Sequence, residues 1–318
     1  MRIAIIGGGI SGLYLSLRLS KKHKVFLFEK KGKIGEKPCS SLYSERIFNF
    51  LPFSNSKDFI KNKIEFCILN FPKRQIKIKF KKKFFVFDRK KLERTLFKLA
   101  KRSGVSFKLN FEIDFEELEQ FKTNFERIIG CDGANSKVRD FLKLKKPDYF
   151  WGIQAFVKGR DFSEVVKVWP TKKGFLWRIP KGKEIEYGIM EKGRRALEIF
   201  ENFKKKEKID FKKKNLALIP QGFSLAENPQ ITLCGDSAGL TKPWSGGGVI
   251  WSLTLADILL KNFPDFLKYK KEAERLFLPQ ISISKFLKRI VYFLGFNLPC
   301  FLPKNYSIDG DFFLLNPL

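Results

Sequence analysis

Residues 3–12 of the chain read Ile-Ala-Ile-Ile-Gly-Gly-Gly-Ile-Ser-Gly, and they decide the fold. The four apolar residues predict a short buried parallel strand, and the glycines that follow have the spacing G-x-G-x-x-G. The leucine-rich residues 13–19 are typical of a helix, and residues 25–28 predict a second buried strand that ends at Glu29. A strand, a glycine-rich turn, a helix and an acidic strand end, in this order, predict a dinucleotide-binding βαβ unit.

Each part of this unit has a physical task. Gly7 allows the tight turn, Gly9 lets the backbone approach a pyrophosphate, and Gly12 lets the helix pack on the strand. The helix N-terminus offers free N–H groups and a partial positive charge to the phosphates. Glu29 can accept hydrogen bonds from ribose hydroxyls, and its charge would repel a 2′-phosphate. The alternative is a plain glycine-rich turn, which the flanking strands and the acid argue against.

The composition is that of a globular protein with an unusual charge. The chain has 318 residues, 44% of them hydrophobic, which is enough for one composite domain or two. The formal net charge is +30, but the lysines are spread along the chain and phenylalanine, at 36, is also over-used. A/T-rich codons or a heat-adapted surface would explain both biases. No nucleic-acid motif is recognisable, so we expect no nucleic-acid partner and keep an anionic membrane surface as an alternative.

The cysteine and histidine content argues against metal chemistry. The five cysteines are scattered without a C-x-x-C pair, which fits a reducing cytosol. His23, the only histidine, lies among lysines. The N-terminus enters a strand at once and no apolar run reaches the roughly 18 residues that span a bilayer, so no signal peptide or membrane span is expected. We therefore expect a cytoplasmic protein without a metal site, with peripheral membrane contact as an alternative.

The rest of the chain extends the α/β pattern and then interrupts it. Between residues 149 and 190 longer strands are punctuated by proline and glycine, which predicts an inserted antiparallel sheet. The predicted fold is a Rossmann-type nucleotide-binding domain with this inserted substrate domain and a short helical C-terminal region. Further strands are predicted at 64–69, 75–80, 84–87, 105–109, 127–131 and 231–234, and helices after Asp88 and at 115–121, 193–208 and 249–260. The predicted boundaries are 1–62, 88–145 and 221–262 for the nucleotide domain, 63–87 and 146–220 for the substrate domain, and 263–318 for the C-terminal region.

Two further acidic motifs follow buried strands and precede helices. The first is Gly130–Ser136 with Arg139, and the second is Cys234–Gly239. Together with the N-terminal glycine-rich fingerprint at residues 7–12, and in this order along the chain, they resemble the flavoprotein hydroxylase superfamily, whose members bind FAD. The resemblance implies that Asp132 and its following glycine lie near the pyrophosphate and that Asp236 holds the ribityl chain. A helix N-cap is the alternative for either aspartate alone.

Four finer motifs resemble the geranylgeranyl reductase family over about residues 1–260. They are Lys37–Ser41 with its Pro-Cys pair, Phe87–Arg89, the aromatic Gly174–Gly182, and Leu240–Gly248, which is the most specific. The resemblance implies an FAD-dependent oxidoreductase that reduces isolated double bonds of prenyl (geranylgeranyl) chains in isoprenoid lipid biosynthesis. It also implies NAD(P)H or a ferredoxin as electron donor.

Three glycines before the helix that begins at Val249 can be interpreted physically. They expose consecutive N–H groups at the positive end of that helix. Reduced flavin carries negative charge near N1 and the C2 carbonyl, which a helix N-terminus stabilises. The alternative is a plain glycine-rich helix start.

The site residues predicted from the motifs and the resemblance fall into three groups. Cys39 is the candidate proton donor, with a small buried residue as the alternative. Phe175, Trp177 and Pro180 are candidates for contact with the substrate, and Trp151 and Trp169 are further candidate wall residues, although each could be core. The predicted cofactor-binding residues are Gly7, Gly9, Gly12, Leu13, Glu29, Lys30, Cys39, Ser40, Arg89, Ile113, Asp132, Gly133, Gly235, Asp236, Gly246, Gly247, Gly248 and Val249.

The departures from the family pattern define the alternatives. Serines stand beside Cys39 where glycines are expected, and Phe-x-Trp-x-Ile-Pro at 175–180 approaches the Trp-x-Trp-x-Ile-Pro of flavin-dependent halogenases. Those enzymes need a catalytic lysine beside the flavin, for which Lys37 and Lys242 are formal candidates. The alternatives are thus a flavin-dependent monooxygenase or halogenase, or a non-catalytic FAD-binding module.

Residues 281–302 combine cations with large apolar side chains. We interpret them first as an ordinary packing helix, and alternatively as a helix that rests on a membrane to admit lipid. The region after residue 263 is short for closing a lipid tunnel.

Overall fold

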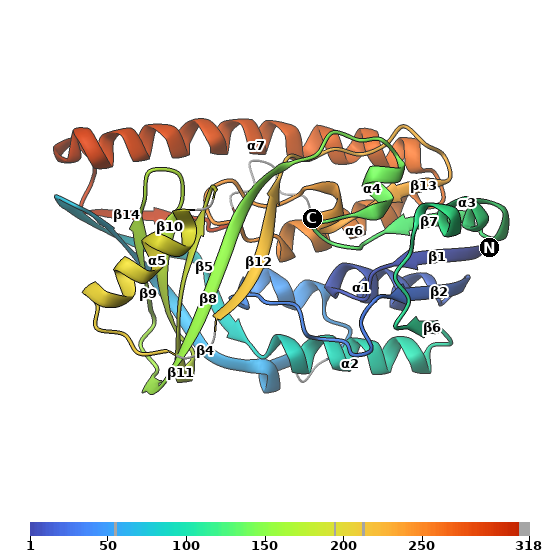
Figure 1. Cartoon of the computed structure of the whole chain (residues 1–318), viewed down its shortest axis with the longest axis horizontal. Coiled ribbons are helices and arrows are strands. Elements are labelled where there is room, and N and C mark those ends of the chain that lie inside the picture. The colour runs from blue at the N-terminus through green and yellow to red at the C-terminus, as the bar shows by residue number, and fades with distance from the viewer. Residues whose placement is uncertain (54–55, 194, 212–213, 312–318) are drawn as a thin grey trace.

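The fold is taken from a computed structural model that describes residues 1–53, 56–193, 195–211 and 214–311. Residue 194 of the predicted helix 193–208 and residues 312–318 of the predicted C-terminal region lie outside these ranges. Two sheets and one long helix organise the molecule (Figure 1).

The first sheet is parallel and has five strands in the order β13-β7-β1-β2-β6. Its central strand, β1, is apolar and buried from Ile3 to Ile6, as a strand covered on both faces must be. The turn after β1 leads directly into α1, so the predicted βαβ unit is present. The strands are β1 (Arg2–Ile6), β2 (Lys24–Glu29), β6 (Ser106–Leu109), β7 (Arg127–Gly130) and β13 (Ile231–Leu233). The helices of this part are α1 (Ile10–Leu19), α2 (Arg89–Arg102), α3 (Phe115–Asn124), α4 (Lys137–Phe141) and α6 (Val249–Asn262).

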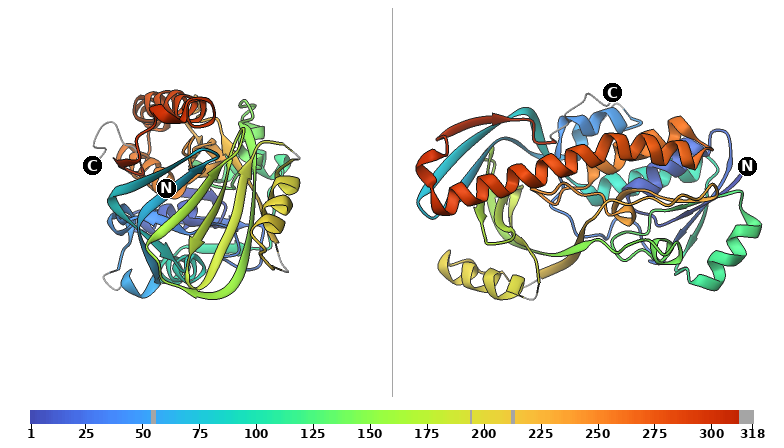
Figure 2. Two further views of the ribbon diagram at one scale, coloured as in Figure 1. Left: turned by 90° about the vertical axis from the view of Figure 1, so that its left-hand side faces the viewer. Right: turned by 90° about the horizontal axis from the view of Figure 1, so that it is seen from above.

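The second sheet has nine strands, is mainly antiparallel and curls around itself (Figure 2). Helix α5 (Arg195–Lys206) covers its outer face. The confirmed fold class is therefore α/β, with a Rossmann-type domain and an inserted antiparallel sheet, whereas the exact domain boundaries stay a prediction. The strands are β3 (Leu42–Ser44), β4 (Ile60–Phe71), β5 (Arg74–Phe87), β8 (Asp148–Asp161), β9 (Val165–Pro170), β10 (Phe175–Pro180), β11 (Gly182–Glu191), β12 (Lys214–Gln221) and β14 (Asn305–Ile308), and short 3-10 turns are η1 (Glu45–Phe50), η2 (Ser56–Phe59), η3 (Gly235–Ala238) and η4 (Pro299–Phe301).

Strand β5 and the C-terminal region differ from the sequence prediction. Residues 75–80 and 84–87, predicted as two strands, belong to one continuous strand. Lys81, Lys82 and Lys83 continue the strand between them, with their side chains exposed. After α7 (Phe266–Asn297), a helix of 32 residues, the chain adds β14 parallel to β5. The C-terminal region therefore adds an edge strand to the large sheet, which the sequence did not predict.

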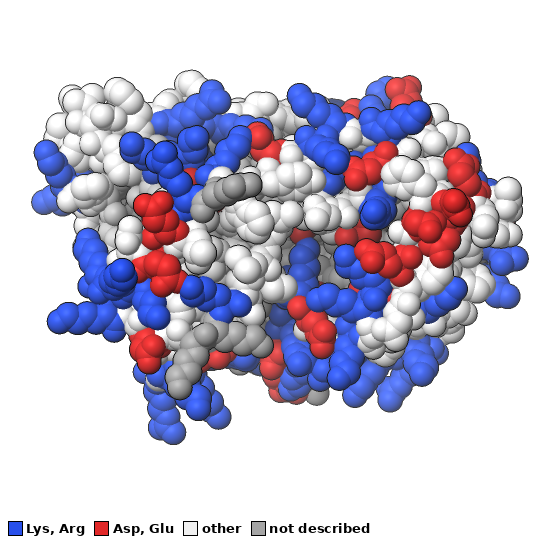
Figure 3. All heavy atoms as spheres, viewed as in Figure 1, with Lys and Arg blue, Asp and Glu red and all other residues white. Residues whose placement is uncertain are grey.

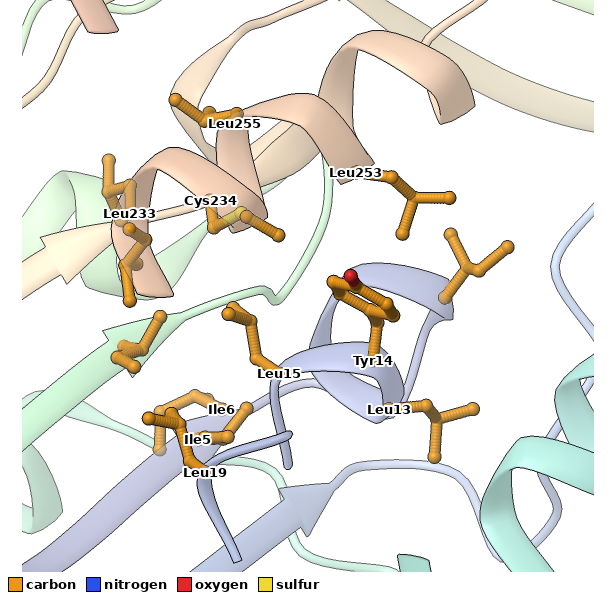
Figure 4. Close-up of a cluster of buried hydrophobic side chains, with 14 of the residues drawn as sticks. Ile5, Ile6, Leu13, Tyr14, Leu15, Leu19, Leu233, Cys234, Leu253 and Leu255 are labelled. Atoms are coloured by element: carbon orange, nitrogen blue, oxygen red, sulfur yellow. The ribbon is translucent and has the colours of Figure 1, made fainter. Parts of the chain in front are cut away.

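The core of the Rossmann part is packed between α1, the parallel sheet and α6 (Figure 4). Leu13 and Leu15 of α1 are fully buried there beside Leu253 and Leu255 of α6. Tyr14 donates a hydrogen bond of 2.6 Å to Asp257, also of α6. This packing fixes the start of α1 relative to the start of α6, and both helix starts face the cavity described below.

Within the described ranges, no helix has the length and apolar character that crossing a bilayer requires.

Candidate functional site

A cavity of about 670 Å³ reaches from the glycine-rich turn after β1 to the inner face of the large sheet. Gly9, Cys39 and Gly247 line it on the Rossmann side. Ile78 of β5 and Phe175 of β10 line it on the sheet side, and α7 covers it. The cavity thus joins a polar, glycine-rich cradle to an apolar chamber.

The three fingerprint glycines have different roles in the structure. A Cβ on Gly7, whose φ is +110°, would lie 2.3 Å from the Cys131 carbonyl oxygen, and one on Gly12 would lie 2.0 Å from the Gly7 oxygen. A Cβ on Gly9 would meet no atom within 4 Å. Gly7 and Gly12 are therefore required by the packing of the protein on itself, whereas Gly9 leaves open space toward the cavity. That open cradle fits a bound pyrophosphate.

The acid at the end of β2 organises the same turn. One carboxylate oxygen of Glu29 accepts a hydrogen bond of 2.6 Å from the Gly8 N–H, and the other accepts one of 2.9 Å from the Lys31 N–H. Lys30 is exposed and lies 3.5 Å from Glu112. Of the other predicted cofactor residues, Ile113 and Leu13 are buried, and neither reaches the cavity.

The Asp132 side chain supports the start of α4, although the N-cap of this helix is Ser136 and not the aspartate. It accepts hydrogen bonds of 2.6 Å from the Ser136 hydroxyl and 3.2 Å from the Val138 N–H at the start of α4. Burial raises the pKa of this carboxyl, and these hydrogen bonds oppose the shift. Gly133, next in the chain, lines the cavity.

Asp236 faces the cavity and is paired with Lys37. The Lys37 ammonium lies 2.5 Å from the Asp236 carboxylate, and also 4.0 Å from the Cβ position of Gly133. Residues from the Pro-Cys segment and from both acidic motifs therefore meet at one place. Gly235, which precedes the aspartate, has a φ of +81° and provides the turn that presents Asp236.

The glycine segment 246–248 forms a tight loop against the cavity. Lys242 closes it, because its carbonyl accepts from the Gly246 N–H at 2.9 Å and its N–H donates to the Gly247 carbonyl at 3.2 Å. A Cβ on Gly246, whose φ is +65°, would lie 2.5 Å from the Met190 sulfur. Gly248 and Val249, at the start of α6, also line the cavity, so the positive end of this helix faces it.

Cys39 lies at the cavity wall beside a buried charged cluster. Its sulfur is 3.8 Å from the Tyr43 hydroxyl and accepts a hydrogen bond of 3.3 Å from the Ser41 N–H. Burial raises the pKa of the Tyr43 hydroxyl well above its ordinary value. Arg89 also reaches the cavity, but its guanidinium donates to Glu93 of the same helix at 2.9 Å.

Strand alternation selects the residues of the apolar wall. Phe175 and Trp177 of β10 line the cavity, whereas Pro180 does not. Trp169 packs on Phe203 of α5, on the outer face, and Trp151 is 40% exposed. The structure therefore brings two of the three predicted substrate residues to the cavity and places both further tryptophans away from it.

Most walls of the chamber come from residues that no sequence motif marks. Its further walls include β4, β8, β9 and β12, helix α7, the segment 302–310, and β5, where Ile76, Ile78 and Phe80 alternate inward. The alternation on β5 was visible in the sequence and could have identified this wall. Residues after 260 carry no comparable signal, and contrary to the expectation of a C-terminal region too short for this task, they do close the cavity.

A partly buried network, which we call the C-terminal latch, joins Asp309 and Asp311 to Ser44, Arg46 and Lys242. Asp311 is 0% exposed and accepts from Lys242 at 2.8 Å, from Arg46 at 3.1 Å and from the Ser44 hydroxyl. Asp309 pairs with Arg46 at 2.6 Å. The latch holds the segment 302–310 over the cavity.

Because of the latch, we expect the free energy of unfolding to depend on pH. Burial by itself would raise the pKa of the Asp311 carboxyl, but Lys242, Ser44 and Arg46 outweigh it and hold that pKa below its usual value. This stabilisation is therefore present above the unfolded pKa of about 3.9 and is lost as the pH falls through the folded-state pKa. We expect Lys242→Met to lower the free energy of unfolding by about 2 kcal/mol at pH 7, because Arg46 and Ser44 remain on Asp311.

Urea unfolding of the wild type, Lys242→Met and Asp311→Asn between pH 7 and pH 3 measures this. The difference between the wild type and Asp311→Asn should shrink below about pH 4. A difference that stays constant down to pH 3 would contradict the assigned role of Asp311.

Comparisons with known proteins agree with this description. A family model described as an NAD(P)-binding Rossmann-like domain matches residues 5–40. A digeranylgeranylglycerophospholipid reductase of Methanococcus vannielii is 23% identical over 290 residues, which cover 78% of this chain and 72% of the relative. A solved geranylgeranyl bacteriochlorophyll reductase-like protein of Thermoplasma acidophilum has a TM-score of 0.72 at 17% identity, covering 91% of this chain and 86% of that one.

A tryptophan 6-halogenase of Streptomyces toxytricini has nearly the same fold similarity. Its TM-score is 0.71 at 14% identity, over 92% of this chain and 78% of the halogenase. At such identities the two solved structures show the shared fold alone. The sequence similarity to the digeranylgeranylglycerophospholipid reductase agrees with the resemblance to the geranylgeranyl reductase family that the motifs predicted.

Proposed function

We propose that this protein is an FAD-dependent oxidoreductase that reduces isolated double bonds of prenyl chains, with a geranylgeranyl lipid as substrate. The observation that carries the proposal is a continuous cavity that joins the open cradle at Gly9 to an apolar chamber lined by Ile78, Phe175 and Trp177. Apolar and aromatic walls suit a hydrocarbon chain that has no polar group near its double bonds. The similarity to a digeranylgeranylglycerophospholipid reductase supports the same substrate class.

The residues at the Rossmann end fit an FAD. Gly9 leaves space for the pyrophosphate, Asp236 faces the cavity at the position proposed for the ribityl chain, and the start of α6 directs its positive end to the cavity. When bound, FAD would supply the hydride-transfer chemistry. We propose NAD(P)H or a ferredoxin as the electron donor.

Reduction of an isolated trisubstituted alkene also needs a proton at the second carbon. The chain's own contribution is to exclude water, to hold the alkene against the wall, and to stabilise cationic character with Phe175 and Trp177. Cys39 lines the cavity, and we propose its thiol as the proton donor.

We expect Cys39→Ala to retain FAD and to reduce the prenyl chain about 100-fold more slowly, which is typical of losing a general acid. Flavin absorbance and single-turnover kinetics of the reduced protein measure the two quantities separately. Cys39→Ser serves as the matched control for side-chain volume. Full activity of Cys39→Ala with normal flavin content would rule out the proton-donor role.

The function itself is tested with the purified protein, reconstituted with FAD and chemically reduced under argon. We expect incubation with a geranylgeranyl lipid to give products heavier by one H₂ for each reduced double bond, measured by mass spectrometry. If the mass of the lipid does not change although the protein still holds FAD, the proposed prenyl reduction is contradicted.

The similarity to a tryptophan halogenase keeps a flavin-dependent monooxygenase or halogenase as the second candidate. Both lysines that could serve such an enzyme are paired with aspartates, Lys37 with Asp236 and Lys242 with Asp311. The same assay in air separates this candidate, since it consumes oxygen, from a non-catalytic FAD-binding module, which turns over neither with nor without oxygen.

A further inference from the structure

The distal half of α7 carries a dense row of exposed large apolar side chains. Ile283, Phe286, Ile290 and Phe293 follow the spacing of one helix face, and Phe286 and Phe293 are 61% and 58% exposed. The row continues into η4, where Phe301 is 71% exposed. We call this surface the apolar ledge; it comprises Ile283, Phe286, Leu287, Ile290, Phe293, Phe296, Leu298, Phe301 and Tyr306.

The opposite face of the same helix is already packed. Ser284 and Gly295 are buried, and a Cβ on Gly295 would lie 2.2 Å from the Phe71 ring. Tyr292 donates a hydrogen bond of 2.8 Å to the Gly174 carbonyl. Helix α7 therefore packs on the described part of the protein through its other face, and the ledge faces outward. An exposed apolar surface of this kind marks an interaction site.

The cavity opens at the ledge. Leu287 is 41% exposed and Tyr306 is 58% exposed, yet both also line the cavity. Val291, Leu302 and Pro303 line the cavity beside them. An apolar path therefore leads from the molecular surface, between α7 and β14, into the chamber.

The segment that carries the ledge has charges of one sign. Residues 275–308 contain no aspartate or glutamate, and Lys285, Arg289 and Lys304 are exposed there. In Figure 3 a largely uncharged area, flanked by basic side chains, covers the end of the molecule where α7 meets η4. Apolar side chains with a basic rim match the interface of an anionic bilayer.

We infer that the apolar ledge docks on an anionic lipid bilayer and that the prenyl chain passes from the bilayer into the cavity between Leu287 and Tyr306. This inference rests on the proposed function for the identity of the chain. Helix α7 lies in the plane of the interface, with its phenylalanines in the acyl boundary and its cations at the lipid phosphates. A lipid tail can then enter the chamber without crossing water.

A second copy of the chain fits the ledge less well than a bilayer. A two-fold contact would bring Lys285, Arg289 and Lys304 of one copy close to the same cations of the other, without an acid in residues 275–308 to offset them. It would also cover the opening at Leu287 and Tyr306.

Co-flotation of the full FAD-loaded chain with vesicles tests the inference. We expect binding to phosphatidylglycerol vesicles, weaker binding to phosphatidylcholine vesicles, and loss of the difference at high salt. The variant Phe286→Ser/Phe293→Ser/Phe301→Ser should bind at least ~100-fold more weakly, because three buried phenylalanines are removed from the acyl boundary. Phe162→Ser/Leu216→Ser is the matched control, because these residues are 59% and 58% exposed and lie outside the ledge.

Activity on two forms of the substrate separates this inference from the proposed function. With a detergent-solubilised prenyl alcohol the triple variant should turn over within about twofold of the wild type, whereas with vesicle-embedded lipid it should lose activity in parallel with its binding. If the wild type reduces neither form, the proposed function fails, and flotation still tests the docking. Equal flotation of the triple variant and the wild type would overturn the docking, as would a wild-type dimer that the three substitutions dissociate.

Discussion

Gly9→Leu should produce a folded protein that does not retain FAD. The backbone of Gly9 is extended, with φ −75° and ψ −178°, and a Cβ there meets no protein atom within 4 Å, so the leucine enters the cradle rather than the core. We expect FAD affinity to fall at least ~1000-fold, or on the order of 4 kcal/mol. The free energy of unfolding should fall by only about 1 kcal/mol, the usual effect of an unfavourable helix N-cap.

Flavin absorbance after reconstitution, calorimetric titration with FAD and thermal unfolding by circular dichroism measure these quantities. Gly12→Ala provides the contrast, because its Cβ would lie 2.0 Å from the Gly7 oxygen and should destabilise the fold itself. Gly159→Leu is the neutral control, since Gly159 is exposed and its Cβ would meet only the Ile185 side chain at 3.7 Å. A normal flavin content in folded Gly9→Leu would refute the placement of the cradle.

Gly247→Leu probes the other end of the proposed flavin site. The nearest atoms to its Cβ position are side-chain atoms of Lys242 and Ser245, both at 3.3 Å, and no backbone atom is among them, so the fold should tolerate the substitution. The added side chain would fill the cavity at the start of α6, and we expect FAD retention to be abolished. If Gly247→Leu retains FAD and Gly9→Leu does not, the proposed position of the pyrophosphate is supported and the proposed position of the isoalloxazine is refuted.

Lys181→Met should cause the largest loss of stability among single substitutions at the site. Lys181 and Glu186 form an ion pair of 2.8 Å with side-chain exposures of 5% and 0%. The Lys181 ammonium also donates to the Ser40 carbonyl at 2.7 Å, and Glu186 accepts from the Trp177 indole N–H at 2.8 Å. Removing the cation leaves a buried carboxylate without its counter-charge, which costs about 3–5 kcal/mol.

The same network ties the apolar wall to the loop that carries Cys39, so Lys181 acts as a positioning residue for both. Urea unfolding measures the stability, and Lys181→Met/Glu186→Gln should recover at least half of the loss, because the orphaned charge is gone. Lys122→Met is the matched control, because its pair with Glu119 is exposed and should contribute less than about 1 kcal/mol. Equal losses in Lys181→Met and Lys122→Met would contradict the assigned role of the buried pair.

Several residues that the motifs marked line one cavity. Gly9, Cys39 and Asp236 line one cavity although they are far apart in the chain, and so do Phe175 and Trp177. They could be anticipated because each lies at a strand end, at a helix start or on an alternating strand, where local pattern fixes direction. The side-chain partners could not be anticipated. Asp132 accepts hydrogen bonds from Ser136 and Val138 at the start of α4, and Arg89 binds Glu93.

The sequence by itself determined the βαβ unit, the order of the three glycine-containing motifs and the alternation of the inserted strands. These are local properties, set by backbone sterics at glycine and by the periods of helix and strand. Only the tertiary structure decided which walls enclose the cavity. β14, the C-terminal latch and the ledge of α7 depend on contacts such as Lys242 with Asp311, between residues distant in the chain. Such contacts are selected by the packing of whole elements, which no short stretch of sequence encodes.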